Sequence, residues 1–230
     1  PSNFDEAGHP VNLLGTMYLG GFVVPIIQGL LVLVLILSVE RLIALGKAKG
    51  AKSVDKFVKE LKAALEADKL EEAKAICAKQ GGSIGNSVLA GVEAYAAMAK
   101  ETTLKKENRI AAIRNALDEA INMEMPTLQQ NMPIIFTNTT LGTLMGLFGT
   151  VLGMIQTFFN MAQTSTGVIE LSSLSAGMYQ AMVTTVGGLI VGIPAYFGYN
   201  YLVARIEKLV FRMEANTIAF MDILNQPAQK

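Results

Sequence analysis

The chain contains 230 residues, of which 51% are hydrophobic, and its 19 basic and 19 acidic side chains give a formal net charge of zero. The mean hydropathy is +0.40. These values exclude an ordinary soluble domain, because the apolar residues are too many and are gathered in blocks. The composition therefore indicates an integral membrane protein.

Three blocks are long enough to cross a membrane, at a rise of ~1.5 Å per residue against an apolar core of ~30 Å. They are residues 22–45, 133–163 and 174–203. Residues 1–21 form a polar, acidic outer segment that ends in apolar positions, a pattern typical of a short interfacial helix. The first block has no basic leader and no small-residue cleavage site, so we do not expect it to be a signal peptide.

Helical patterns also fill the long loop at 46–132, between the first and second blocks. The predicted loop helices cover residues 53–79, 84–99 and 104–125. We expect the last of them to continue into the second span, with a bend at Pro126 or Pro133. Residues 204–230 continue the third span as a C-terminal helix. The predicted fold is all-α, with three transmembrane helices extended into a cytoplasmic helical bundle.

The basic residues predict the orientation of the chain in the membrane. Fourteen of the 19 lie at 46–132 and four lie at 204–230, whereas none lies at 133–204. By the positive-inside rule the loop at 46–132 and the C-terminal helix face the cytoplasm, and the N-terminus and the loop at 164–173 face outward. Cys77 is then cytoplasmic, where a disulfide is not expected.

The second and third spans each have a small or polar face and an apolar face when drawn at 100° per residue. In the second span the small or polar positions occupy an arc of roughly 140°. They are Thr139, Gly142, Thr143, Gly146, Gly149, Thr150, Gly153, Gln156, Thr157 and Asn160. In the third span they are Gly177, Gln180, Ala181, Thr184, Thr185, Gly188, Gly192, Ala195 and Gly198.

Two interpretations of these faces are open. Glycines four residues apart allow close packing between membrane helices, so the faces could serve packing alone. However, Gln180, Thr184 and Thr185 are more polar than packing requires, and polar groups in hydrocarbon need protein or water as partners. Thr143, Thr150 and Thr157 also recur every seven residues on one stripe. The pattern favours two helices that line a shared polar interior.

The sequence offers little for enzymatic chemistry. It has no nucleotide-binding loop, no cluster of metal ligands and no pair of nucleophile and base, and His9 is its one histidine. The lysines at 47–62 are interleaved with acidic residues and lack an aromatic platform, so we expect no nucleic-acid binding. No enzyme activity, cofactor or metal is expected. No acid or base lies within the membrane core either, because Glu40 and Arg41 are at the inner end of the first span. A proton would therefore need a carboxylate from a partner.

Three segments carry a resemblance to a known family. They are Gly146-Leu-Phe-Gly-Thr-Val-Leu-Gly-Met-Ile, Gly177-Met-Tyr-Gln-Ala-Met-Val-Thr-Thr-Val-Gly-Gly-Leu and Gly192-Ile-Pro-Ala-Tyr-Phe-Gly-Tyr-Asn. They resemble the proton-channel family that contains MotA, TolQ and ExbB, in particular its ExbB/TolQ branch and most closely ExbB. The likeness covers roughly residues 130–203, and three spans rather than four disfavour the MotA type.

The resemblance implies a homopentamer in the bacterial inner membrane, with a central pore occupied by a dimer of a single-span ExbD-like or TolR-like partner. The partner's membrane aspartate would titrate, and a TonB-like transducer would carry the work to outer-membrane transport. A TolQ-like role in envelope maintenance and a non-conducting membrane scaffold remain alternatives. Membrane lipids are further expected partners.

The expected site residues follow from the faces and the resemblance together. Residues expected to line the pore or the proton pathway are Thr143, Thr150, Thr157, Gln180, Thr184, Thr185 and Asn200. Residues expected to pack helices are Gly142, Gly146, Gly149, Gly153, Gly188, Gly192 and Pro194. The resemblance places Thr150 and Thr185 at the family's pore threonines. Gln180 stands where the family often has a glutamate, and glutamine cannot carry a proton.

Overall fold

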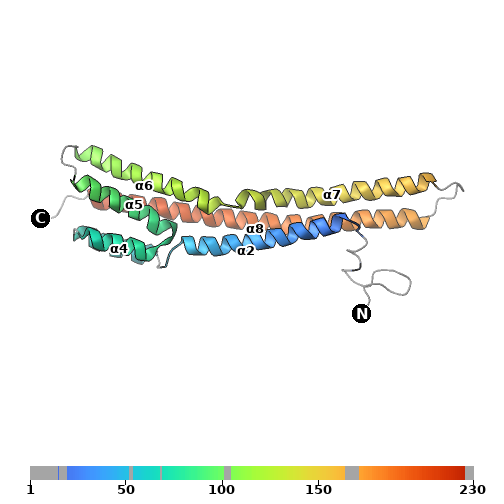
Figure 1. Cartoon of the computed structure of the whole chain (residues 1–230), viewed down its shortest axis with the longest axis horizontal. Helices are drawn as coiled ribbons and strands as arrows, with labels where there is room; N and C mark the ends of the chain where they lie inside the picture. The colour runs from blue at the N-terminus through green and yellow to red at the C-terminus, as the bar shows by residue number, and fades with distance from the viewer. Residues whose placement is uncertain are drawn as a thin grey trace. The chain divides into compact units, whose positions relative to one another are not determined.

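The computed structural model describes residue 15 and residues 20–51, 54–67, 69–100, 105–163 and 171–225. The secondary-structure elements in these ranges are helices (Figure 1). They are α2 (Val23–Ala48), α3 (Val54–Glu66), α4 (Leu70–Gln80), α5 (Gly82–Lys100), α6 (Lys106–Gln129), α7 (Met132–Gln163) and α8 (Leu171–Asn225). Most of the N-terminal segment at 1–21 and of the loop at 164–173 lies outside the described residues.

Three membrane-crossing candidates are found among the described residues, in agreement with the predicted number. They lie in Val23–Ala48, Lys106–Gln163 and Leu174–Leu224. Large apolar side chains such as Leu147, Phe158 and Phe197 are exposed on these helices. Exposed apolar side chains along a long helix are typical of contact with lipid. The chain is therefore an all-helical, multi-pass membrane protein.

The chain divides into two compact units. Unit 1 comprises Pro1–Val39 and Asn131–Asn200, and unit 2 comprises Glu40–Gln130 and Tyr201–Lys230. In unit 1, α8 packs against both α7 and α2. A small apolar cluster joins the three helices, with buried residues from α2 and α8 and partly buried residues from α7. Its members are Val23, Ile27, Val191, Leu30, Leu31, Met145 and Leu152.

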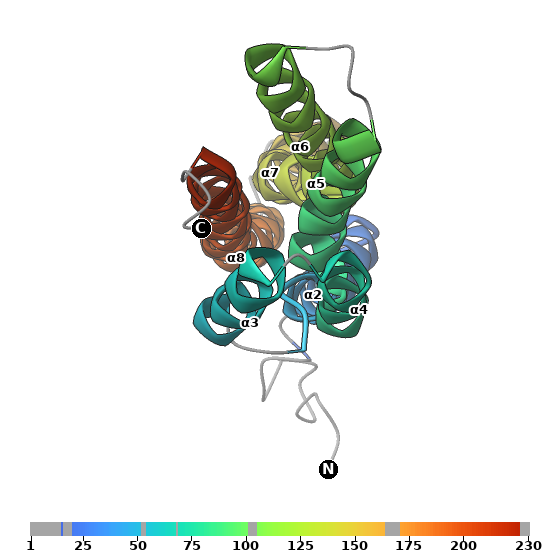
Figure 2. The ribbon, with the colours of Figure 1, turned by 90° about the vertical axis from the view of Figure 1, so that its left-hand side faces the viewer.

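Unit 2 contains a more conventional helical core. Here α3 packs on α4, α4 on α5 and α5 on α6, and Figure 2 shows α3 and α4 lying next to each other. Phe57, Cys77, Ile84 and Leu117 have at most 1% of their surface exposed. α5 and α6 approach closely at Gly91, where an added Cβ would lie 2.4 Å from the Leu117 Cδ2 atom and would displace that buried side chain.

The helix predicted over 53–79 is wrong in one respect. The structure contains two helices there, since α3 ends at Glu66 and α4 begins at Leu70. In a continuous helix Phe57 and Cys77 would lie ~30 Å apart along the axis. The turn instead lets α3 pack back on α4 with both side chains buried, so tertiary packing overrides the local helical pattern.

The bend expected at Pro126 or Pro133 lies between these prolines instead. Pro126 is inside α6, whereas Asn131 adopts a positive φ of 62° between α6 and α7. Asparagine tolerates this left-handed conformation better than most residues. The Ile135 amide donates to the Asn131 carbonyl at 3.1 Å in the first turn of α7. Pro133 lies in that first turn, where its missing N–H costs little.

Candidate functional site

A seam of glycines joins α7 to α8 within unit 1. A Cβ added to Gly146 would lie 3.1 Å from the Gly188 Cα atom, and one added to Gly153 would lie 3.0 Å from the Ala181 Cβ atom. A Cβ on Gly192 would meet the Thr143 hydroxyl at 2.6 Å. The two backbones therefore approach too closely for most side chains. The seam glycines are Gly142, Gly146, Gly149 and Gly153 on α7 and Gly177, Gly188 and Gly192 on α8.

Two of the expected pathway threonines lie inside this seam. Thr157 and Thr184 have 5% and 1% of their surface exposed. Their hydroxyls donate to backbone carbonyls of their own helices, at Gly153 and Ala181 respectively, both at 2.7 Å. A buried hydroxyl that has such a bond is satisfied without water or a partner. These two side chains pack α7 against α8 in this chain.

Three other threonines lie along one open side of the helix pair, which we call the threonine flank (Thr143, Thr150 and Thr185). Each directly follows a seam position and is therefore rotated by ~100° from it. Because α7 and α8 run in opposite directions, a rotation of the same sense brings the side chains of both helices to the same side. Thr143 is exposed, and Thr150 and Thr185 are half-buried.

The hydroxyls of the threonine flank have weaker or more accessible bonds than those in the seam. The Thr185 hydroxyl reaches across to the Gly146 carbonyl on α7 at 3.4 Å, and the Thr143 hydroxyl lies 3.4 Å from the Thr139 carbonyl. Thr150 donates to the Leu147 carbonyl at 2.6 Å. Each hydroxyl oxygen retains lone pairs that can accept a bond from water or from a partner.

Gln180 lies on the opposite side of the pair. It directly precedes a seam position, as do Met145, Leu152 and Val191, and this is the side on which α2 packs. A Cβ on Gly21, where φ is +71°, would lie 2.5 Å from the Gln180 Nε2 atom. Within one chain, the structure therefore separates Gln180 from the threonine flank.

Asn200 and Pro194 lie further along α8. Asn200 is exposed, and its side-chain nitrogen donates to the Tyr196 carbonyl at 2.9 Å. Asn200 is roughly 60° further round the helix than Thr185, so it extends the threonine flank only approximately. Pro194 is inside α8 and exposed, and its ring leaves the Ile190 carbonyl without the usual helical donor.

The sequence reasoning missed a buried asparagine. Asn138 is 3% exposed, and its Nδ2 atom donates to the Ile134 carbonyl at 2.9 Å. Its Oδ1 atom has no hydrogen-bond partner among the described residues. The sequence did indicate it, because Asn138 directly precedes Thr139, the first residue of the polar face of the second span.

The sequence analysis also assigned no role to a buried arginine. Arg41 on α2 is 3% exposed. It forms a two-pronged ion pair with Glu40, with its Nε atom 2.7 Å from the Glu40 Oε2 atom, and it donates to the Thr127 carbonyl on α6 at 3.2 Å. An arginine fork satisfied by a carboxylate and a carbonyl can be buried at tolerable cost. Here it ties α2 to α6 within unit 2.

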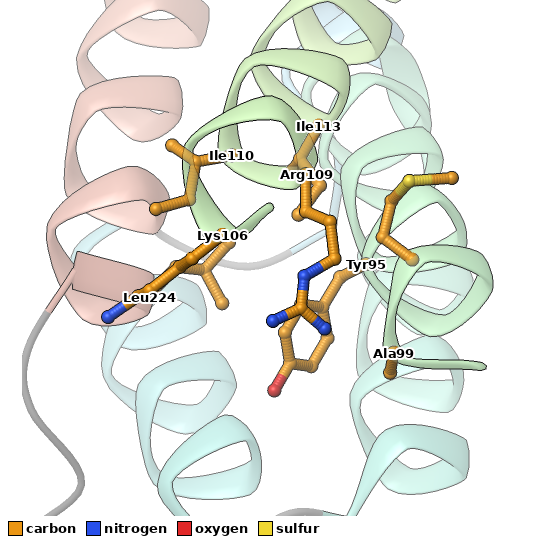
Figure 3. A pocket seen from close by; sticks show the side chains of 8 residues that line it. Tyr95, Ala99, Lys106, Arg109, Ile110, Ile113 and Leu224 are labelled. Carbon is orange, nitrogen blue, oxygen red and sulfur yellow. The ribbon is translucent and has the colours of Figure 1, made fainter. Parts of the chain in front are cut away.

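Unit 2 also contains a hollow of about 320 Å³ between α5, α6 and the end of α8. Figure 3 shows Arg109 and Tyr95 among the residues that line the hollow, together with Lys106 and Leu224. No group of three or more potential metal ligands occurs among the residues that the structure describes. We assign no chemistry to this hollow.

A match to a known protein family covers the second and third spans and part of unit 2. The model of the MotA/TolQ/ExbB proton channel family matches residues 87–215. This range contains α7, the spanning part of α8 and every residue of the threonine flank. No curated protein matches the chain in sequence.

Proposed function

The chain belongs to the MotA/TolQ/ExbB proton channel family, and we propose that within it the chain is an ExbB-like subunit of a motor driven by the proton-motive force. The motor would energise TonB-dependent transport across the outer membrane from the bacterial inner membrane. The family is associated with proton channels and transport rather than typically with enzymes.

The observation that carries this proposal is the threonine flank. Its hydroxyls lie on one side of the α7–α8 pair, while α2 packs on the other side and large apolar residues face outward. In a homopentamer whose flanks face a central axis, Thr150 and Thr185 would form polar rings. Such rings can hydrogen-bond to water and to a partner carboxylate but cannot titrate themselves.

The titrating group would come from a partner with a single span, of the ExbD or TolR kind, bound as a dimer in the pore. An unpaired carboxylate beside an apolar wall is costly to ionise, so the hydroxyl rings would ease its deprotonation. Each proton that crosses ~100 mV gains about 2.3 kcal/mol, so several protons would be needed for a large conformational step. A TonB-like transducer would deliver this work.

Valine substitutions test the proposal, because valine approximates the volume of threonine and lacks the hydroxyl. We expect Thr150→Val and Thr185→Val to abolish energy-dependent uptake, while oligomer size and partner co-purification stay unchanged. Gln180→Ala should have a milder effect, since Gln180 faces α2 and does not titrate. Thr137→Val is the matched control, because Thr137 is an exposed threonine of α7 outside the flank. Wild-type uptake in both flank variants would rule the proposal out.

Two other roles stay open to the same assays. A TolQ-like subunit would restore envelope integrity in cells that lack the Tol system. It would not restore TonB-dependent uptake in cells that lack the ExbB system. A non-conducting scaffold is favoured by the glycine seam and by the self-satisfied hydroxyls of Thr157 and Thr184. A scaffold would keep its oligomer and its function in all the threonine variants, and it would not co-purify with an aspartate-bearing single-span partner.

A further inference from the structure

A basic pocket in unit 2 has no role in the proposed proton pathway. Its volume is about 330 Å³, near the lower end of the range for small-molecule sites. The basic pocket is lined by Leu45, Lys49, Arg205, Lys208, Leu209 and Arg212. The first two come from the end of α2 and the residue after it, and the other four come from α8.

The α8 residues of the basic pocket share one helix face. Positions 205, 208, 209 and 212 are spaced by three and four residues, which places them on the same side. Leu45 and Leu209 are 8% and 6% exposed and form an apolar floor. Four cations therefore surround a small apolar surface, which suits an amphipathic anion better than a fully hydrated one.

The cations of the basic pocket form no ion pair within the described part of the chain. Among the residues that the structure describes, no carboxylate forms an ion pair with Lys49, Lys208 or Arg212. Glu207 is ~200° round the helix from Arg205 and is exposed on another face. Four positive charges gathered without an anion repel one another, so a bound anion would relieve that repulsion.

One of the cations is held in place by an aromatic neighbour. The Nε and Nη2 atoms of Arg205 lie 3.0 and 2.7 Å from the Tyr201 hydroxyl oxygen. The Arg205 guanidinium carbon is also 5.2 Å from the centre of the Tyr201 ring. Tyrosine at this kind of position is typical of the membrane–water interface. The contact reduces the conformational entropy that Arg205 would lose on binding a ligand.

The basic pocket lies just beyond the apolar stretches of its two helices, where lipid headgroups are expected. Leu45 and Lys49 follow directly on the apolar stretch of α2. Arg205 is the first basic residue after the apolar stretch of α8. Basic pockets beside membrane helices on the cytoplasmic side are suited to anionic headgroups. We propose that the basic pocket binds the phosphate of an anionic phospholipid, with the start of its acyl chains over Leu45 and Leu209.

Lipid titration of the full-length protein in the complex as purified tests this proposal. Native mass spectrometry would compare phosphatidylglycerol with phosphatidylcholine of the same acyl chains. We expect preferential retention of phosphatidylglycerol, and the double variant Lys208→Gln/Arg212→Gln should weaken it about thirty-fold, given the usual contribution of two basic residues. The charge-conserving variant Lys208→Arg/Arg212→Lys should keep most of the preference.

Lys100→Gln/Arg114→Gln is the matched control, because it removes the same two charges from exposed positions of unit 2 outside the basic pocket. An equal loss in this control would overturn the proposal in favour of general surface charge. The absence of any preference in the wild-type protein would also overturn it. A third result would overturn it as well: inorganic phosphate binds the basic pocket, the double variant loses this binding, and lipid retention is unchanged. The ligand would then be a free anion.

Loss of the oligomer in the double variant, in phosphatidylcholine alone, would show instead that the basic pocket holds an acidic segment of a neighbouring copy. That result would likewise overturn the proposal. Neither outcome depends on proton conduction, so the lipid site and the motor function can fail independently.

Discussion

Cys77 lies in the core of unit 2 with 1% of its surface exposed. Burial raises the pKa of its thiol from the ordinary value of 9.0 to about 12, because the thiolate would lose its solvation. At pH 8 the folded protein should then react with a disulfide reagent about a thousand-fold more slowly than an exposed cysteine, since the thiolate is the reactive form. Thiol titration with and without denaturant measures the difference.

The same pKa shift predicts a pH effect on stability. The folded pKa lies above the unfolded one, so the contribution of this thiol is fully present below pH 9 and is lost as the pH rises towards about 12. Cys77→Ala should lose this alkaline dependence. Rapid, stoichiometric labelling of Cys77 in the native protein would show that the side chain is not buried.

Arg41 gives a second prediction at the scale of a residue. Replacing it by methionine keeps the apolar stem but leaves the Thr127 carbonyl without this donor. Glu40 is 44% exposed and can be solvated, so the main loss is one charge-assisted hydrogen bond and the ion pair. We expect Arg41→Met to lower the free energy of unfolding by about 1 to 3 kcal/mol. Denaturant titration followed by circular dichroism checks this, with the exposed Arg114→Met as control, and equal stability of the two variants would contradict it.

At the scale of elements, the packing of α7 on α8 depends on how closely their two backbones approach rather than on single hydroxyl groups. A Cβ on Gly188 would lie 2.5 Å from the Gly142 carbonyl oxygen and 2.8 Å from the Gly146 Cα atom, and backbone atoms cannot move aside without shifting a helix. We expect Gly188→Ala to destabilise unit 1 by about 1 to 3 kcal/mol. Unfolding in mixed detergent micelles measures the change.

Gly29→Ala is the control for this prediction, because a Cβ there meets nothing within 4 Å. In an open helical position alanine should be neutral or stabilising by up to about 1 kcal/mol. Equal stability of the two variants would mean that α7 and α8 do not approach as closely as the seam indicates. Larger residues at Gly149 or Gly153 should fail for the same reason, by clashing with α8 of the same chain before any effect on assembly.

At the scale of elements, helix type and length were predictable, but several ends were not. The apolar stretches of α2, α7 and α8 are long enough that local composition decides them. The turn between α3 and α4 has no strong breaker in the sequence, because it serves the packing of α3 on α4. The positive φ at Asn131 was likewise not predicted, because the prolines on either side of it are the stronger signals for a bend in a sequence.

The topology of the whole molecule can be tested from its two loops. In a Cys77→Ala background, Lys105→Cys should react with a membrane-impermeant thiol reagent only after the cells are permeabilised, because most basic residues share the loop that contains it. Ser165→Cys, in the loop between the second and third spans, should react in intact cells. The opposite pattern of labelling would invert the orientation proposed here.

By itself the sequence determined that this protein is helical, that three of its segments can cross a membrane and that two of them have a polar face. These properties depend on length and periodicity, which are local. Only the tertiary structure decided how each polar face is divided: Thr157 and Thr184 are sealed in the α7–α8 seam, Gln180 lies against the α2 side, and Thr143, Thr150 and Thr185 share the open flank. The reason is physical: adjacent residues within one polar arc can contact different helices. A helical wheel shows one helix alone and not the helices that pack around it.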